Sequence, residues 1–242
     1  MELKVLASGS SGNCYILRDG PHALLLDAGI QYSRILKGLS FQLEGVLGAL
    51  ITHEHNDHSA AVSGLLRAGI PCCMSKGTRE ALGIPTAPPI MEIVEYQKLS
   101  LGSFLILPFP AKHDAAEPMG FLILNKATGE RLVYATDTYY LPHTFPGIHY
   151  WLIECNYVDS FITEDTPSYM KSRLLKSHMS LDRLCGVFKA NDLTRCRQII
   201  LCHISGQRGD SEIMVEAITQ ISRKPVTTAI PDATIPLNLQ PF

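Results

Sequence analysis

The sequence predicts an α/β protein, an αββα sandwich in which two sheets pack face to face and helices cover their outer faces. Three observations support this prediction. The chain has 242 residues, of which 46% are apolar, enough to bury one large core. Short apolar runs bounded by turn residues recur along the chain, and segments with helical apolar spacing stand between groups of these runs. No repeat or long linker interrupts the pattern, so we expect one domain over residues 1–242.

The expected elements follow from these apolar runs and from the glycines and prolines that interrupt them. Strands are predicted at Leu3–Leu6, Cys14–Leu17, Ala23–Leu26, Gly45–Thr52, Pro71–Met74, Glu92–Glu95, Phe104–Pro108, Met119–Leu124, Arg131–Ala135, Tyr150–Glu154 and Gln198–Leu201. Helices are predicted at Ala60–Ala68, Lys76–Leu82, Asp165–Leu175, Leu181–Ala190 and Asp210–Ile221. Ser180 is predicted as the N-cap of the helix that follows it, and the proline-rich segment Ile84–Pro89 as a loop.

Charge and cysteine content narrow the class of protein. A net charge of -2 argues against a generally basic nucleic-acid-binding surface, so any such surface must be local. The seven cysteines are odd in number and form no CxxC motif, which indicates reduced thiols and a cytoplasmic protein. The N-terminal residues suit a strand better than a signal peptide, and no apolar run approaches the roughly 18 residues of a membrane span.

The densest functional signal is an HxHxDH motif that follows an apolar run. Its potential ligands are His53, His55, Asp57 and His58. Side chains alternate along an extended segment, so the first two histidines can face one metal ion. Asp57 and His58 come after the chain begins to turn and can face a second. A polar loop with hydrogen-bonded histidines is the alternative, but four side chains of the types that bind zinc within six residues favour a metal site.

Three further residues follow predicted strands and are candidate ligands for the same site. His113 comes shortly after Phe104–Pro108, Asp137 after Arg131–Ala135, and His203 after the strand that ends near Leu201. Strand ends are rigid positions from which a scaffold can aim ligands. Taken singly, each residue has a plainer interpretation, as a loop histidine, a turn former or an edge residue.

The order of these residues resembles the metallo-β-lactamase superfamily, and the resemblance covers nearly the whole chain up to His203. It implies a four-layer αββα metallo-β-lactamase sandwich that binds two divalent metal ions. Zinc is the expected ion, with manganese and iron as alternatives. The implied ligands are His53, His55 and His113 for one ion, Asp57, His58 and His203 for the other, and Asp137 for both. Such a pair of ions would hold a hydroxide nucleophile between them, which Asp57 would also orient.

Two further positions resemble the YycJ/WalJ-like and tRNase Z-like branches of this superfamily. His178 begins a His-Met-Ser sequence, and Glu154 ends an apolar run. The resemblance implies that His178 contacts the scissile phosphate or protonates the leaving oxygen, and that Glu154 orients His178. A histidine at a helix N-terminus and a buried, ion-paired glutamate are the plainer interpretations. The Gly/Ser turn Ala7–Cys14 also resembles the YycJ/WalJ-like branch, whereas Tyr157 stands where that branch has histidine.

The prediction of the substrate depends on residues that flank the candidate site residues in the sequence. Ser205 and Arg208 resemble the tRNase Z ending and are predicted to bind phosphate. Lys171, Arg173 and Lys176 could also bind phosphate, although a solvated helix face is their usual interpretation. The segment 114–136 is too short for a long tRNA-gripping arm.

We therefore predict an enzyme that cleaves phosphodiester bonds of nucleic acid, of the YycJ/WalJ-like exonuclease type, by attack of a metal-bridging hydroxide. A phosphodiesterase of small cyclic nucleotides, and a metallo-hydrolase of esters, thioesters or lactones, are the alternative enzymes. A binding module that keeps the fold without activity is a third alternative, against which the intact ligand set argues. A homodimer is common among similar proteins. The sequence leaves open DNA against RNA and exonuclease against endonuclease action.

Overall fold

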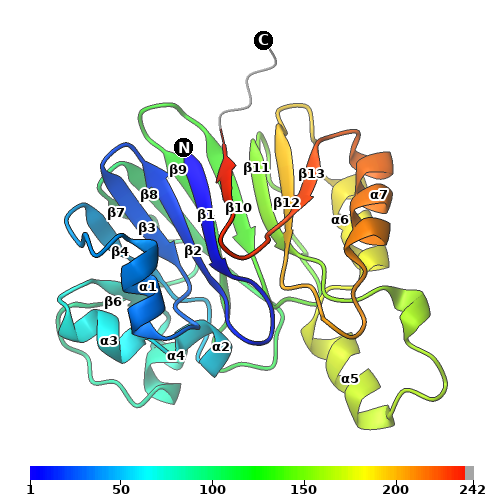
Figure 1. The fold of residues 1–242 in the computed structure, drawn as a ribbon, viewed down its shortest axis with the longest axis horizontal. Helices are drawn as coiled ribbons and strands as arrows, with labels where there is room; N and C mark the ends of the chain where they lie inside the picture. The colour runs from blue at the N-terminus through cyan, green and yellow to red at the C-terminus, as the bar shows by residue number, and fades with distance from the viewer. Residues whose placement is uncertain (238–242) are drawn as a thin grey trace.

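The computed structural model describes residues 1–237, apart from the side chain of Met170, and its strands form two seven-stranded sheets (Figure 1). The first sheet has the order β14-β1-β2-β3-β4-β5-β6 and the second β13-β12-β11-β10-β9-β8-β7. The first sheet contains β1 (Glu2–Ala7), β2 (Cys14–Asp19), β3 (His22–Leu26), β4 (Val46–Leu50), β5 (Cys72–Met74), β6 (Ile90–Glu92) and β14 (Thr234–Pro236). The second contains β7 (Leu99–Leu101), β8 (Phe104–Pro110), β9 (Met119–Asn125), β10 (Arg131–Ala135), β11 (Tyr150–Glu154), β12 (Gln198–Cys202) and β13 (Val226–Thr228).

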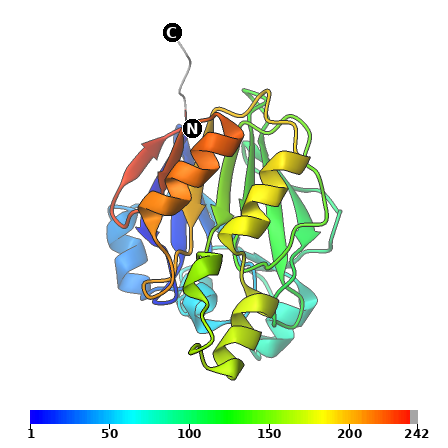
Figure 2. The same ribbon diagram turned by 90° about the vertical axis from the view of Figure 1, so that its right-hand side faces the viewer.

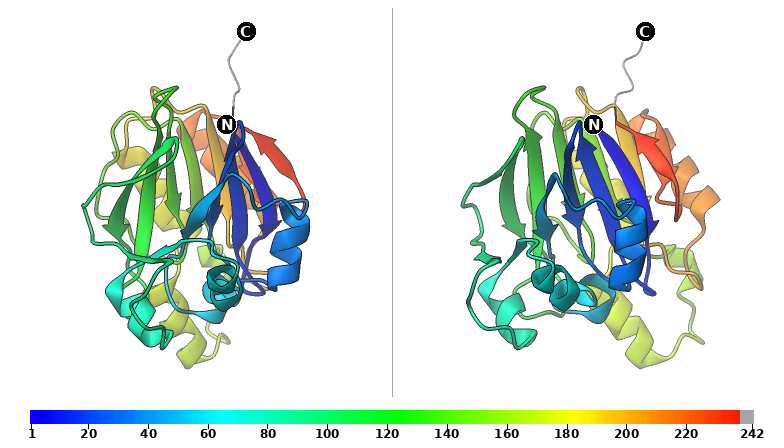
Figure 3. Two further views of the ribbon diagram at one scale, coloured as in Figure 1. Left: turned by 90° about the vertical axis from the view of Figure 1, so that its left-hand side faces the viewer. Right: turned by 60° about the vertical axis from the view of Figure 1, so that its left-hand side comes forward.

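Helices cover the outer faces of both sheets and one end of the strands. They are α1 (Tyr32–Gly38), α2 (Asn56–Ser59), α3 (Val62–Arg67), α4 (Lys76–Ala81), α5 (Ser168–Ser177), α6 (Leu181–Ala190) and α7 (Ser211–Ser222), with a 3₁₀ turn at Asp159–Phe161. Figure 2 shows α6 and α7 over the second sheet, and Figure 3 shows α1 against the first. The architecture is therefore the predicted four-layer αββα sandwich.

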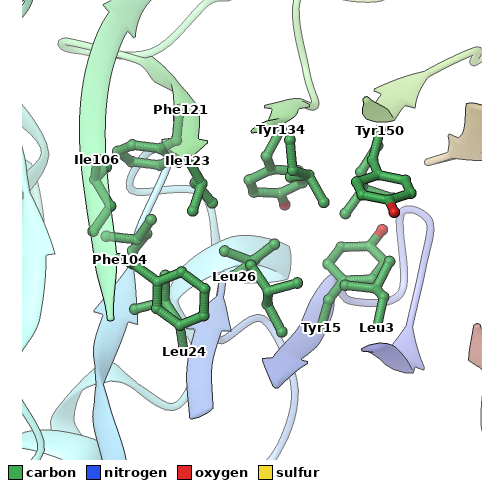
Figure 4. Packing of buried hydrophobic residues seen from close by; sticks show 14 of the residues in the cluster. Leu3, Tyr15, Leu24, Leu26, Phe104, Ile106, Phe121, Ile123, Tyr134 and Tyr150 are labelled. Atoms are coloured by element: carbon green, nitrogen blue, oxygen red, sulfur yellow. The ribbon is translucent and has the colours of Figure 1, made fainter. Parts of the chain in front are cut away.

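The layers are held together by strands that bury both of their faces. In β11, Tyr150 and Leu152 pack into the core between the sheets, whereas Trp151 and Ile153 pack under the helices that cover the second sheet. Successive side chains of a strand point to opposite faces, so a strand with an apolar partner on each side reads as a continuous apolar run. Figure 4 shows the inner core, where side chains of the two sheets interdigitate. The rings of Tyr15 and Tyr134 pack edge to face there, with their centroids 5.8 Å apart.

The strand directions bring several loops to one end of the molecule. β3, β4 and β5 are parallel neighbours in the first sheet, and β10, β11 and β12 are parallel neighbours in the second. β8 runs in the same direction as β10 because both are antiparallel to β9. The carboxyl ends of parallel strands meet at one edge of a sheet, which is where ligand sites form in such folds.

Most of the predicted elements are confirmed, within a few residues at their ends. The Ser180 hydroxyl accepts a hydrogen bond from Arg183 N, as predicted for an N-cap. The strand predicted at Glu92–Glu95 is wrong: β6 ends at Glu92, and the chain then turns so that Tyr96, with a φ of 60°, donates its amide to Pro108 O. The sequence patterns do not predict helices α1 and α2, the 3₁₀ turn at Asp159–Phe161, or strands β7, β13 and β14. No helix among residues 1–237 combines the length and apolar character needed to cross a bilayer.

Candidate metal centre

Seven predicted ligands from four separate segments meet at the carboxyl ends of the strands. The loop after β4 and helix α2 supply His53, His55, Asp57 and His58, and the segments after β8, β10 and β12 supply His113, Asp137 and His203. Their ligand atoms form two clusters, each with all atoms within 4.8 Å of one another. The structure therefore brings together side chains that are up to 150 positions apart in the sequence.

The first cluster consists of the imidazoles of His53, His55 and His113. His55 Nδ1 lies 3.1 Å from His53 Nε2 and 3.2 Å from His113 Nε2. The Nδ1 atom of His113 donates to the carbonyl of Ser177 at 2.7 Å, which leaves Nε2 as the atom with a lone pair. Burial lowers the pKa of both His53 and His113, and so favours their neutral forms. Three imidazole nitrogens that converge in this way suit a metal such as zinc.

The second cluster consists of Asp57, His58, Asp137 and His203. His58 Nε2 lies 3.3 Å from Asp137 Oδ1, and Asp57 Oδ2 lies 3.7 Å from both His58 Nε2 and His203 Nε2. Asp137 also reaches the first cluster, because its Oδ2 lies 3.7 Å from His113 Nε2. His203 Nε2 is buried and has no hydrogen-bond partner among the described residues, so a bound cation would satisfy it. These residues therefore fit a metal ion, and Asp137 lies between the two clusters.

Charge explains how the side chains of the second cluster are held together. Burial would lower the pKa of His58, but the carboxylates of Asp137 and Asp27 outweigh it and raise that pKa to about 10. Burial likewise opposes the charged form of Asp137, yet the imidazoles of His203 and His58 hold its pKa well below its usual range. The cluster is thus a set of ion pairs in which a metal would replace the imidazole protons, and metal binding releases protons for this reason.

A carboxylate that the sequence prediction missed supports His58. Asp27 follows β3, is fully buried, and its Oδ2 lies 2.8 Å from His58 Nδ1. Its oxygens also accept hydrogen bonds from Thr52 N at 2.8 Å and from the Tyr134 hydroxyl at 2.5 Å. Such a partner fixes the imidazole so that Nε2 faces the metal. The available signal was a single aspartate at the end of the apolar run Ala23–Leu26.

Asn13, in the Gly/Ser turn, is a second missed residue. Its side chain is buried, bonds to both the amide and the carbonyl of Gly9, and has Nδ2 3.1 Å from His58 Nε2. The turn that the resemblance singled out therefore lies against the second cluster.

The predicted pair of Glu154 and His178 is assembled beside the two clusters. Glu154 Oε1 lies 2.7 Å from His178 Nδ1 and 2.9 Å from His203 Nδ1. Its Oε2 accepts the backbone amides of Thr138 and Met179, each at 3.0 Å. Burial raises the pKa of this carboxyl group, but the imidazoles of His178 and His203 together lower it more, and Glu154 in turn raises the pKa of His178 against that ring's own burial. This interaction favours the protonated form of the His178 imidazole, which is 8% exposed and fixed through Nδ1.

The structure places Ser205 and Arg208 in a turn after His203 and outside both ligand clusters. The hydroxyl of Ser205 accepts the backbone amide of Arg208 at 3.3 Å, and the carbonyl of Arg208 accepts the amide of Val158. The backbone of this turn is therefore tied to itself and to the segment after β11. Phosphate binding by Ser205 and Arg208 stays a prediction.

The comparisons with known proteins agree with this arrangement. A Beta-lactamase superfamily domain model matches residues 22–204. The chain is 27% identical over 240 residues to Exodeoxyribonuclease YycJ of Bacillus anthracis, covering 91% of this chain and 89% of that protein. It is 27% identical over 228 residues to Exodeoxyribonuclease WalJ of Streptococcus pneumoniae, covering 86% and 83%.

Solved structures share the fold at lower identity. The metallo-β-lactamase fold protein YhfI of Bacillus subtilis superposes with a TM-score of 0.75 at 16% identity, over 96% of this chain and 98% of that one. The short form of human tRNase Z superposes with a TM-score of 0.68 at 17% identity, over 99% and 100%.

Proposed function

This chain belongs to the beta-lactamase superfamily, and from that premise we propose that it is a metal-dependent hydrolase of the phosphodiester bonds of nucleic acid. The observation that carries the proposal is the hydrogen-bonded pair of His178 and Glu154 next to the two ligand clusters. Two relatives that span most of the chain are named exodeoxyribonucleases, which supports removal of nucleotides from a DNA end.

We assign the seven ligands to two ions. His53, His55 and His113 would hold one ion, Asp57, His58 and His203 the other, and Asp137 would bind both. Zinc suits the imidazole-rich set, and manganese or iron are the alternatives. When bound, two such ions would supply a nucleophile at neutral pH by lowering the pKa of a shared water to about 7.

The remaining groups of the chain position and move protons. Asp57, whose Oδ2 faces the ring nitrogens of both His58 and His203, is placed to orient the attacking water. Glu154 accepts the Nδ1 proton of His178 and raises the pKa of this ring, which favours the imidazolium form, and the imidazolium would present its Nε2–H group to a substrate. His178 would donate this proton to the oxygen that leaves the phosphorus.

A phosphodiester needs this proton more than an activated ester does. The leaving group is an alkoxide of high basicity, and proton transfer from a positioned acid typically contributes about 10²–10⁴-fold to the rate. The carboxylate behind His178 is itself fixed by two backbone amides, so the donor is held in one orientation. The pair therefore favours phosphodiester chemistry over ester, thioester or lactone hydrolysis.

The test uses the purified full chain with zinc or manganese on a panel of substrates. The panel contains end-labelled duplex DNA, single-stranded RNA, 2′,3′- and 3′,5′-cyclic nucleotides, bis-p-nitrophenyl phosphate and an activated carboxylic ester. We expect mononucleotides to be released from a DNA end and the activity to vanish on chelation. Preferential hydrolysis of the carboxylic ester would contradict the proposal.

The variant His178→Ala tests the proton donor separately. Turnover of DNA should fall by about 10²-fold or more, since the leaving oxygen would depart without a proton. Metal analysis of the same sample should still give two ions per chain, because His178 is not among the proposed ligands. Unchanged turnover would remove His178 from the mechanism.

A further inference from the structure

We propose that helix α5 binds the phosphate backbone of the nucleic-acid strand whose end lies in the metal centre. This inference rests on the proposed function and names the surface that holds the substrate. α5 projects beyond the body of the protein at the end of the strands where α2 and the metal centre lie (Figures 1 and 2).

The helix carries a concentrated positive charge in a chain that is acidic overall. Lys171, Arg173 and Lys176 are all exposed, and the ten residues of α5 include no Asp or Glu, whereas the whole chain has a net charge of -2. None of the three side chains forms an ion pair or a hydrogen bond within the part of the chain that the structure describes. These cations are therefore available for phosphate groups of a ligand.

The exposure of α5 separates it from an ordinary surface helix. α6 buries five of its side chains against the second sheet, whereas in α5 residues 168, 169, 171–173, 175 and 176 are all exposed. Tyr169 is 73% exposed and Leu175 is 38% exposed. A helix with cations and a solvent-facing aromatic ring has the two features by which proteins hold single strands, namely charge for the backbone and a ring on which a base can stack.

The last turn of α5 is joined to the centre by one hydrogen bond and by the chain itself, and to α6 by a second hydrogen bond. The carbonyl of Ser177 accepts Nδ1–H of the proposed ligand His113 at 2.7 Å, and that of Leu175 accepts the Arg183 guanidinium at 2.8 Å. His178, the proposed proton donor, is the C-cap residue of the same helix. A strand that lies along α5 therefore leads directly to the group that acts on the scissile bond.

The charge and position of α5 favour a nucleic-acid strand over an acidic protein as its occupant. A strand bound there would be continuous with the substrate in the centre, whereas a protein partner would block the path to His178. DNA and RNA share the backbone chemistry that the three cations would recognise, so the experiment includes both.

The test measures equilibrium binding of the metal-loaded full chain to a fluorescent single-stranded DNA. The DNA has about 20 nucleotides and phosphorothioate linkages that slow hydrolysis. In the variant Lys171→Gln/Arg173→Gln/Lys176→Gln, Kd should rise about tenfold at low salt. The slope of log Kd against log salt concentration should fall by about 2, because each lost phosphate contact to a single strand lowers this slope by about 0.7. The same changes are expected with RNA of equal length.

A matched control removes three exposed cations from the opposite end of the strands. Lys126 follows β9, Lys189 lies in the last turn of α6, and Arg195 precedes β12. All three side chains are exposed. Their change to Gln should alter Kd less than twofold. Equal effects of the two triple variants would overturn the proposal, because they would indicate general electrostatics. An equal loss of affinity for polyglutamate would overturn it as well, by showing that α5 binds acidic chains of any kind.

Two further measurements distinguish a failure of the α5 proposal from a failure of the proposed function. The variant Lys171→Arg/Lys176→Arg should retain DNA binding within about twofold, since charge and not lysine itself is required; loss of binding there would overturn the proposal. Binding that depends on α5 in a protein without hydrolytic activity would contradict the proposed function alone. Hydrolysis of DNA with unchanged Kd in the triple Gln variant would contradict the α5 proposal alone.

Discussion

The two ligand clusters of the centre differ in the groups that stand behind their imidazoles. In the first cluster, His53 and His113 bond to neutral oxygens, the Thr52 hydroxyl and the Ser177 carbonyl. In the second, His58 and His203 each face a buried carboxylate, Asp27 and Glu154. A carboxylate behind an imidazole raises its basicity and fixes its orientation. We therefore expect the second cluster to hold its ion more tightly than the first.

The clusters also differ in their exposure. Among the imidazole ligands, His58 and His203 are buried, whereas His55 of the first cluster is half-buried; the His113 side chain is 1% exposed. The first ion would then be the one nearer to solvent and to the exchange of ligands. Substitutions test this difference, first at the residue that the clusters share and then at the residues that distinguish them.

The largest effect is expected from Asp137→Ala. Asp137 has one oxygen 3.3 Å from His58 Nε2 and the other 3.7 Å from His113 Nε2, so its removal affects both clusters. Two buried imidazoles whose pKa values it raises would lose their main counter-charge. We expect metal content to fall below one ion per chain and turnover to fall by about 10³-fold or more, since the water would no longer be activated. Full metal content would show that Asp137 does not bridge the clusters.

A smaller effect, on turnover more than on metal content, is expected from Glu154→Gln. Glu154 accepts bonds from both His178 and His203, so the variant weakens the proton donor and one imidazole of the second cluster together. Turnover should fall about 10- to 100-fold, the usual range for removal of such a partner. In a His178→Ala background the same change should cost much less, because the two residues act as one unit.

Glu130→Gln is the matched control for this change. Glu130 is also a buried glutamate, but it pairs with Arg197 at the opposite end of β10. It should leave turnover within about twofold, and a similar loss in both variants would mean that Glu154 acts through general stability.

The ligands of the two clusters and the residues that support them cannot be predicted equally well from the sequence. Four ligands within one short loop form a dense signal, and the strand-end positions of His113, Asp137 and His203 follow from apolar runs such as β10 and β12. Asp27 has no such signal, since it lies 31 positions from His58 and 107 from Tyr134, and only the packed sheets bring the three together. The support behind a ligand is thus a property of tertiary structure.

The same distinction applies to the fold. β11 buries all five residues, so its apolar run predicted it. β7, β13 and β14 have three residues each, and β13 and β14 lie at sheet edges with exposed polar side chains, so their patterns resemble turns. The residues that follow β6 turn instead of extending the strand, and Tyr96 there has a left-handed backbone, a conformation that is uncommon for a side chain of this type.

Asp27→Asn should weaken the second cluster alone. The amide keeps the size of the carboxylate but loses its charge, so the His58 imidazole becomes a weaker ligand. We expect the affinity for one of the two zinc ions to fall about 10- to 100-fold, measured by competition with a chromophoric chelator. Asp192→Asn, which changes an exposed aspartate in the loop before β12, should leave both affinities unchanged. An equal loss of both ions would contradict the separation of the clusters.

The smallest effect, a difference in rate, is expected when a chelator removes zinc from the wild-type chain. The ion of the first cluster should leave first, since His55 is half-buried and no carboxylate stands behind the imidazoles of His53 and His113 among the described residues. We expect two phases of about one ion each that differ in rate by about tenfold, the scale on which such partners alter metal affinity. Asp27→Asn should accelerate the slow phase and leave the fast phase unchanged, because Asp27 contacts only the His58 side of the centre. A single phase, or acceleration of the fast phase by Asp27→Asn, would mean that the two clusters release their ions as one unit.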